Sequence, residues 1–234
     1  GMSGTMSEKK QLHRVSEVFD AWAESGRAEG MEEGHAFAAR EAFRRLELEP
    51  GQRYLDIGCG NGYSVRWAAE QAESVEAYGL DVSAKMIARA RRQSEHLPNA
   101  RFIHAPFPIR ELKARSFDAM LSMEVFYYLE NLEWGLLSAA RLLKPGGRFA
   151  CVVDYYEENV ASHDWPQDLS VKMTLLSADG WQAAMTDVGF EVLDQTRIKA
   201  PLAADEEPSW KHTEGSLLTV VSAPWHETPE SAQA

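Results

Sequence analysis

The chain carries short apolar runs that alternate with longer stretches of helix-forming residues. The apolar runs occupy residues 54–57, 74–82, 101–104 and 116–123. The stretches 64–71 and 84–92 between them are rich in good helix formers. Short buried strands separated by helices are typical of the parallel sheets of α/β domains. The pattern therefore predicts a doubly wound α/β fold.

The second half of the chain begins with the same alternation. Leu136, Ala139, Ala140 and Leu143 are spaced as on one face of a helix. Pro145 and the glycine pair that follows it are expected to end this helix and to turn the chain into a fifth strand.

After the fifth strand, residues 154–176 are too long for an ordinary loop and mix aromatic with acidic side chains. We expect this stretch to form part of a binding pocket. Ser177 can cap a following helix, which Gly189 ends. The runs 190–198 and 217–222 then predict two closing strands.

Two helices are predicted before the first strand, at Leu12–Trp22 and His35–Leu46. Gly26, Gly30 and Gly34 are expected to break the chain between them. The acidic pair shortly before His35 has two interpretations. It can place an acid and an imidazole over a binding site, or it can mark the start of the second helix, which is the simpler interpretation.

The first apolar run contains Asp56 and opens into a turn with three alternate glycines, Gly58, Gly60 and Gly62. Glycine permits positive φ and removes the Cβ atoms that would keep a ligand away from the backbone. The turn therefore predicts a nucleotide-type binding site; the alternative is a tight turn without a ligand. A dinucleotide-binding turn would need its third glycine at Tyr63.

The second apolar run ends at another acid, Asp81. A carboxylate at the carboxyl end of the second strand of an open α/β sheet lies in the binding crevice, where it can accept hydrogen bonds from both ribose hydroxyls. The alternative role for Asp81 is to cap the next helix, but Ser83 already suits that position.

These features together resemble the class I (Rossmann-like) S-adenosylmethionine-dependent methyltransferases, in the type 11-like branch that acts on small molecules. Asp56 before G-x-G-x-G, then Asp81, then Leu143-Lys144-Pro145-Gly146-Gly147 follow the order typical of that family. The resemblance runs from about Gly51 to Asp154, and more loosely to Ala223. It implies S-adenosylmethionine as the cofactor.

The resemblance also implies an architecture. We expect a seven-stranded, mostly parallel sheet with an antiparallel last strand and helices on both faces. Residues 1–48 would form an N-terminal helical lid, and residues 49–223 the methyltransferase domain, with an acceptor-side insertion at about 154–176. Residues 224–234 would be a flexible tail.

The cofactor contacts are expected along the carboxyl edge of the sheet. Asp56 and the backbone of Gly58 and Gly60 would hold the methionine part, and Asp81 the ribose. Val82, Met86, Pro106 and Phe107 would surround the adenine. Cys59 and Met123 complete the expected cofactor-binding set.

One family feature is missing. Many members carry Gly-Asp-Ala after the third strand, and the acid accepts from the adenine amino group; this chain has Ala105, Pro106 and Phe107 there. Either adenine is recognised through backbone groups at Phe107 and an apolar wall, or the cofactor is held less tightly. His104, at the end of that strand, is expected to be structural.

Methyl transfer from a sulfonium needs mainly alignment of acceptor and methyl group. Glu124, just past the fourth strand, is the first candidate for a catalytic polar group, and Tyr128 the second. The alternative for Glu124 is a solvent-facing residue at a helix start. Residues expected in the acceptor pocket are His35, Tyr127, Tyr155 and Trp165, with simple packing as the alternative for the aromatic side chains.

Composition narrows the acceptor. Asp and Glu outnumber Lys and Arg by 36 to 24, which gives a net charge of −12. Such a surface repels a phosphate backbone, so nucleic acid is not expected, and small molecules and proteins remain. With the family resemblance, we expect a small-molecule acceptor. Cys59 and Cys151 are the only cysteines and show no metal-ligand grouping, so no metal is expected.

No apolar run reaches the roughly 18 residues of a membrane span, and the first residues lack the layout of a signal peptide, so we expect a cytoplasmic protein without membrane contact. Two alternative functions remain open. The missing adenine acid is consistent with a non-catalytic module that binds S-adenosylmethionine or S-adenosylhomocysteine. A nicotinamide oxidoreductase is disfavoured by Tyr63. The acceptor atom and the oligomeric state are not predicted.

Overall fold

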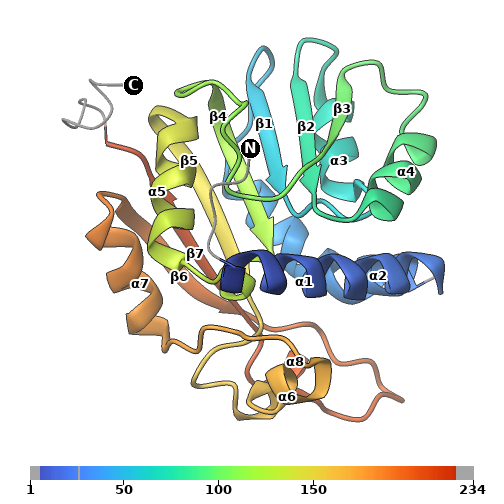
Figure 1. Cartoon of the computed structure of the whole chain (residues 1–234), viewed down its shortest axis with the longest axis vertical. Coiled ribbons are helices and arrows are strands. Elements are labelled where there is room, and N and C mark those ends of the chain that lie inside the picture. The colour runs from blue at the N-terminus through green and yellow to red at the C-terminus, as the bar shows by residue number, and fades with distance from the viewer. Residues whose placement is uncertain (1–5, 26, 225–234) are drawn as a thin grey trace.

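The computed structural model describes residues 6–25 and 27–224; for residues 6–8 and 27–33 it describes the backbone alone. A seven-stranded sheet runs through its centre in the order β3-β2-β1-β4-β5-β7-β6 (Figure 1). The strands are β1 (Arg53–Ile57), β2 (Glu76–Asp81), β3 (Ala100–His104), β4 (Phe117–Met123), β5 (Leu143–Val153), β6 (Glu191–Ile198) and β7 (Ser216–Ser222). Only β7 runs against its neighbours β5 and β6. The predicted mixed sheet is confirmed.

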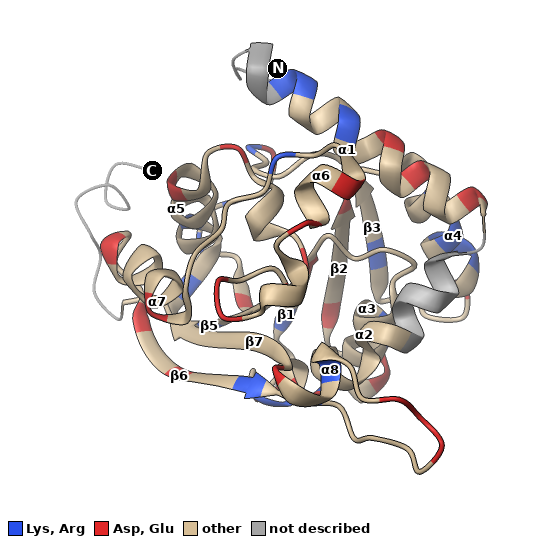
Figure 2. Ribbon diagram, turned by 90° about the horizontal axis from the view of Figure 1, so that it is seen from below, with Lys and Arg blue, Asp and Glu red and all other residues tan. Residues whose placement is uncertain are grey.

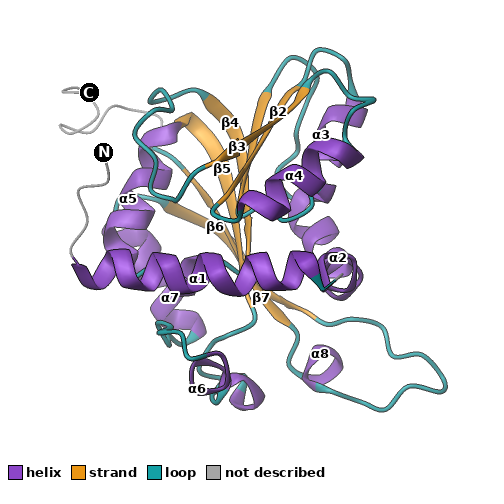
Figure 3. Ribbon diagram, turned by 45° about the vertical axis from the view of Figure 1, so that its right-hand side comes forward, coloured by secondary structure: helices purple, strands orange, loops and turns teal. Residues whose placement is uncertain are grey.

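Helices cover both faces of the sheet (Figure 3). The helices are α1 (Met6–Glu24), α2 (Arg27–Arg44), α3 (Tyr63–Gln71), α4 (Ala84–Gln93), α5 (Leu132–Leu142), α6 (Trp165–Leu169), α7 (Ala178–Asp187) and α8 (Trp210–Thr213). Two 3₁₀ turns, η1 (Phe126–Tyr128) and η2 (Val160–Ser162), complete the set in the described residues. α2, α3 and α4 contribute to one apolar cluster, and α5 and α7 to another.

The two clusters lie on opposite faces because strand side chains alternate. In β1, Tyr54 belongs to the cluster with α2 and α3, whereas Leu55 and Ile57 belong to the cluster with α5 and α7. All three are fully buried. A central strand that is apolar on both sides explains why the sequence reads as a continuous apolar run rather than as a polar–apolar alternation.

The strand order reverses between β1 and β4, and this point sets the position of the site. Ile57 at the end of β1 lies opposite Leu80 of β2 and Ser122 of β4. The residues that follow these strands therefore meet at one edge of the sheet. α1 crosses that edge in Figure 1.

Helix starts at both predicted caps are confirmed. The Ser83 hydroxyl accepts a hydrogen bond from the Met86 amide, and the Ser177 hydroxyl accepts one from the Gly180 amide. The insertion at 154–176 contains η2 and α6. α8, in the connection before β7, was not predicted; it spans only four residues and is stabilised by a capping box between Ser209 and His212.

The predicted break between the first two helices is wrong in extent. α2 starts at Arg27, so Gly30 and Gly34 lie inside it, and the segment before His35 is not a helix start. Gly26 falls outside the described residues. Glycine in a helix costs about 1 kcal/mol relative to alanine. Burial of Ala39, Ala42 and Phe43 on the same helix outweighs that cost.

Candidate active site

A cavity of about 1310 Å³ opens along the carboxyl edge of the sheet. It is lined by the glycine turn, the residues that follow β2, β3 and β4, the η1 turn, the α6 segment and the inner side of α1. Val15, Phe19 and Trp22 of α1 cover it. The first helix thus closes a crevice that would otherwise open to solvent.

The glycine turn is fixed to β2 by its backbone. The Gly58 amide donates to the Leu80 carbonyl at 2.7 Å, and the Gly60 amide donates to Asp81 Oδ2 at 2.8 Å. A Cβ on Gly58 would lie 2.2 Å from Val125 Cγ2, whereas one on Gly60 would meet no atom within 4 Å. Gly60 alone of this pair therefore presents an open face to the cavity.

Asp56 lies beneath this turn and does not line the cavity. One of its oxygens accepts a hydrogen bond from Ser64, and Ser64 in turn contacts the Tyr54 hydroxyl at 2.7 Å. Its Oδ1 is buried without a hydrogen-bond partner. Burial raises the pKa of Asp56 to about 7, more than the Ser64 contact lowers it. The predicted direct contact with the ligand is thus not visible for Asp56, which supports the turn from below.

Asp81 lies in the cavity wall, as the sequence predicts. Its Oδ2 accepts from the Gly60 amide and its Oδ1 accepts from the Ser83 amide at 2.9 Å. Each carboxylate oxygen can accept a second hydrogen bond, so both retain capacity for a ligand donor. Burial raises the pKa of Asp81 to about 6.

The residues expected around adenine form a largely apolar part of the wall. The lining includes Cys59, Val82, Met86, Pro106, Phe107 and Met123. His104 also lines it, but its Nε2 lies 3.0 Å from the Val82 carbonyl, in agreement with the structural role expected for it. The position of the missing family acid is occupied by this apolar wall.

Glu124 lies on the other side of the cavity, directly after β4. It has a positive φ of 65° and lines the cavity. Its Oε1 accepts a hydrogen bond from the Asp154 amide and its Oε2 accepts one from the Tyr127 hydroxyl. Burial, and then the neighbouring Asp154, raise the pKa of Glu124 well above its usual range. The alternative of a solvent-facing helix-start glutamate is therefore wrong.

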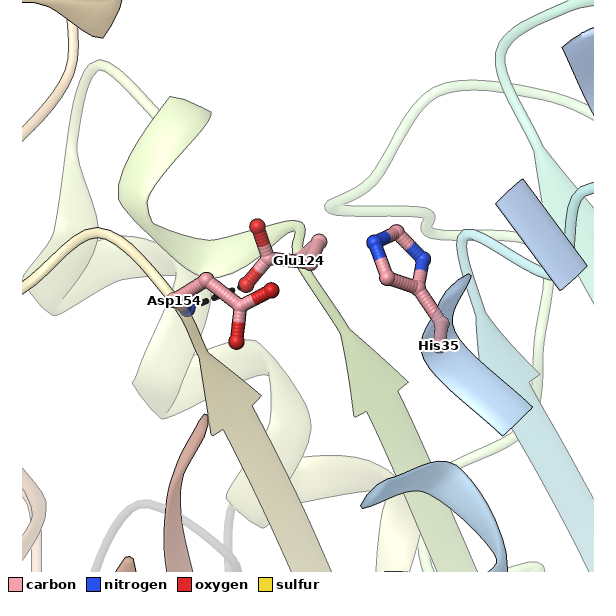
Figure 4. A group of neighbouring side chains, drawn as sticks. All are labelled: His35, Glu124 and Asp154. Atoms are coloured by element: carbon pink, nitrogen blue, oxygen red, sulfur yellow. Dashed lines mark hydrogen bonds between the residues drawn. The ribbon is translucent and has the colours of Figure 1, made fainter. Parts of the chain in front are cut away.

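Glu124 belongs to a group with His35 of α2 and Asp154, the residue after β5 (Figure 4). One ligand-type atom from each lies within 4.8 Å of the others. Burial, and then the charge of Lys211, lower the pKa of His35 to about 4, so the imidazole is neutral near pH 7. Burial raises the pKa of Asp154 to about 6 despite a hydrogen bond with Ser216.

The aromatic residues predicted for the acceptor pocket divide into two groups. Tyr127 and Trp165 line the cavity, but Tyr155 does not; Tyr128, the second catalytic candidate, also lines it. Tyr155 is 4% exposed and packs against Tyr127 with a ring separation of 5.6 Å, so its side chain fills the core behind the wall. Burial raises the pKa of Tyr128 above its usual range, so its hydroxyl is protonated at neutral pH.

Asp154 and Lys211 line the cavity but were not singled out from the sequence. Asp154 directly follows the fifth strand, just as Glu124 directly follows the fourth. Its place at the same edge of the sheet could therefore have predicted that it lies in the site. Lys211 had no such signal, because it sits on the unpredicted α8.

Comparison with known proteins agrees with this geometry. A family model described as a methyltransferase domain matches residues 55–151. One solved structure is a complex between the Haloferax volcanii Trm112 methyltransferase activator and a candidate methyltransferase. A chain of that structure is 36% identical in sequence to this chain and superimposes with a TM-score of 0.81. The alignment covers 88% of this chain and 97% of that chain.

The chain spans less than two thirds of the length of the curated relatives described next. An O-methyltransferase of Pyrenophora dematioidea is 30% identical over 68% of this chain and 61% of the relative. A demethylmenaquinone methyltransferase of Tropheryma whipplei is 34% identical over 47% of this chain and 44% of the relative. The chain belongs to the class I S-adenosylmethionine-dependent methyltransferase family, and its cofactor is S-adenosylmethionine.

The residues present fit this cofactor. Gly60 leaves room for a ligand against the backbone, and Asp81 has free acceptor capacity at the cavity wall. The bound cofactor supplies a methyl group activated by its sulfonium charge. The protein's own residues would orient the ligands, with Asp81 at the end of β2 and Glu124 and Asp154 directly after β4 and β5. Among the described helices, none is long and apolar enough to cross a membrane.

Proposed function

We propose that the chain transfers the methyl group of S-adenosylmethionine to a small-molecule acceptor. The observation that carries this proposal is the lining of the cavity at the edge of the sheet. The same cavity is lined by Gly60 and Asp81 and by Glu124, Tyr127 and Trp165. A volume of about 1310 Å³ leaves room for a compact acceptor beside the cofactor, since drug-sized ligand pockets measure about 300–1,000 Å³.

The individual roles follow the geometry. Asp81 would hold the ribose, the backbone of Gly58, Cys59 and Gly60 the methionine part, and the apolar wall the adenine. Glu124 would orient the acceptor, held in position by the Asp154 amide and the Tyr127 hydroxyl. Tyr128 is the weaker candidate for a catalytic group, because it packs against Phe19 at a ring separation of 5.8 Å.

Charge supports an acceptor other than nucleic acid. Figure 2 shows Asp and Glu positions on α1, α6 and α7 and along the loop between β6 and α8, together with Lys and Arg positions on α1. With a net charge of −12, the chain as a whole disfavours approach of a phosphate backbone.

Turnover tests the proposal directly. Incubation with S-adenosylmethionine and a panel of small hydroxylated, amine and thiol compounds should release S-adenosylhomocysteine with at least one of them, above the rate without acceptor. Tight cofactor binding without turnover on any of them would favour the alternative, a non-catalytic module of the same fold.

A second proposal concerns a protein partner. Because the Haloferax volcanii chain occurs in a complex with the Trm112 methyltransferase activator, we propose that this chain also binds an activator of that kind. Co-purification of the two as a stoichiometric complex would support this. If the pair stays separate in size-exclusion chromatography at micromolar concentration, this proposal fails while the first stands.

A further inference from the structure

The group of His35, Glu124 and Asp154 has a composition that neither cofactor binding nor a single catalytic carboxylate requires. It combines one imidazole nitrogen with two carboxylates, contributed by α2 and by the residues after β4 and β5. Figure 4 shows the imidazole facing the two acids across one gap. Nitrogen and oxygen donors arranged in this way are those that bind borderline divalent cations such as Mn²⁺, Fe²⁺ and Zn²⁺.

The distances are compatible with one shared ion. The three ligand-type atoms lie within 4.8 Å of one another. Ligand atoms around one such cation are separated by about 3 to 4.4 Å, given bonds of about 2.0–2.2 Å, so a small side-chain rotation is sufficient.

A second observation points to a missing ligand. Asp154 is only 3% exposed, lines the cavity, and has an oxygen, Oδ1, without a hydrogen-bond partner. A buried carboxylate oxygen without a donor is costly, and a cation at this point would satisfy it.

Glu124 is already held as metal-binding carboxylates usually are. The Asp154 amide donates to one oxygen and the Tyr127 hydroxyl to the other, which fixes the orientation of the group and leaves further lone pairs free. Its positive φ of 65° turns the side chain into the cavity rather than along the strand.

We propose that His35, Glu124 and Asp154 bind a divalent cation of the Mn²⁺ or Fe²⁺ type at the acceptor end of the cavity. Three protein ligands leave coordination positions open. Resting on the proposed function, the acceptor would then be an oxygen-bearing compound that takes one of these positions.

Lys211 is the group that opposes the ion. Its charge acts on both His35 and Asp154, and its Nζ lies 3.3 Å from where a Cβ on Gly34 would be. Lys211→Ala should therefore strengthen cation binding several-fold, because a like charge is removed. Unchanged or weaker Mn²⁺ binding in Lys211→Ala would contradict a cation beside His35 and Asp154.

The test is titration of the wild-type chain with Mn²⁺ alone, followed by calorimetry and by the loss of the free-ion paramagnetic resonance signal. We expect one equivalent bound, about tenfold or more weaker binding in His35→Ala and Asp154→Asn, and no change in His163→Ala. His163 is an exposed histidine whose Nε2 contacts the Glu157 carbonyl at 2.9 Å.

Absence of Mn²⁺ binding by the wild type, or equal binding by the His35 and Asp154 variants, would overturn the proposal. If those variants do not fold by circular dichroism, the wild type decides. Fe²⁺ with ascorbate and peroxide should then cleave the backbone near residues 35, 124 and 154; cleavage elsewhere or nowhere contradicts the site. S-adenosylhomocysteine binding without metal is measured separately, so failure of the metal site and of the proposed function are distinguishable.

Discussion

At the scale of single residues, the site depends on where buried carboxylates find donors. Asp81 accepts from two backbone amides and keeps capacity for two more donors, whereas Asp56 lies beneath the turn with one oxygen unpaired. Both side chains are acids near glycines, but only Asp81 lines the cavity. Their substitutions should therefore have different consequences.

Asp81→Ala should weaken S-adenosylhomocysteine binding by about 1 to 3 kcal/mol, the usual loss for a charged hydrogen-bond partner. Isothermal titration calorimetry measures this. Asp187→Ala, which removes an exposed acid on α7, is the matched control and should bind as the wild type does. Unchanged affinity in Asp81→Ala would remove Asp81 from the site.

The glycine turn offers a matched pair. Gly60→Ala should still fold, because its Cβ meets no atom within 4 Å, although the φ of +54° costs an alanine about 1 kcal/mol. The added Cβ should weaken S-adenosylhomocysteine binding by intruding on the cavity. Gly58→Ala should lower the free energy of unfolding by about 2 kcal/mol or more, because its Cβ would overlap Val125. Denaturant unfolding and calorimetry separate the two effects. The opposite assignment, with Gly58→Ala stable and Gly60→Ala unfolded, is incompatible with the structure.

Asp56 provides a prediction for pH. Its folded-state pKa, about 7, is above its value in an unfolded chain, so ionising it costs stability as pH rises from about 4 to 7. Asp56→Asn avoids this cost. Without ligand, the variant should gain on the wild type by about 3 kcal/mol between pH 4.5 and pH 7.5, at about 1.4 kcal/mol per pKa unit. Denaturant unfolding at both pH values checks this; a parallel pH dependence in the two proteins would show that Asp56 does not titrate there.

At the scale of elements, α1 is the helix that covers the site. The Ser83 hydroxyl, which caps α4, donates to Asp20 of α1, and the Ser16 hydroxyl of α1 donates to the Val82 carbonyl at 3.3 Å. Both contacts hold the covering helix at the end of β2. Phe19 and Trp22 of the same helix line the cavity.

Asp20→Ala should loosen this cover. We expect faster dissociation of S-adenosylhomocysteine, by about threefold to tenfold, with a smaller change in association, because a contact of about 1 kcal/mol holds the helix closed. Stopped-flow displacement measures both rates. Glu17→Ala, on an exposed part of α1, is the control. Identical dissociation rates for Asp20→Ala and wild type would show that α1 does not gate the ligand.

The same scale explains what sequence could predict. β1 and its turn are coded locally, by an apolar run and by glycines that need positive φ, and both were predicted. The predicted start of α2 was wrong because the burial of Ala39 and Phe43 outweighs the low helix propensity of Gly30 and Gly34. Helix propensities along the chain do not include the free energy of burying a helix against the rest of the fold.

The proposed cation site could not be predicted from the sequence, for a related reason. His35, Glu124 and Asp154 come from three separate elements and meet only because β4 and β5 pair in register and α2 packs beside them. No spacing rule along the chain joins them. The glycine turn and Asp81, in contrast, could be identified from residues that are neighbours along the chain.

At the scale of the whole molecule, one cavity at the strand-order reversal unites the cofactor residues with the acceptor side, beneath a covering helix. This arrangement accounts for the family membership and for the proposed activity. It also separates two functions along one wall. Under the proposed function, Gly60 and Asp81 would bind the cofactor, and Glu124 and Asp154 would face the acceptor.

The central claim is that this cavity binds S-adenosylmethionine. Calorimetric titration of the purified chain with S-adenosylhomocysteine, with NADH as the control ligand, tests it most directly. The account predicts one S-adenosylhomocysteine bound per chain and no heat of binding from NADH. Failure of a well-folded chain to bind S-adenosylhomocysteine, or preference for NADH, would contradict it.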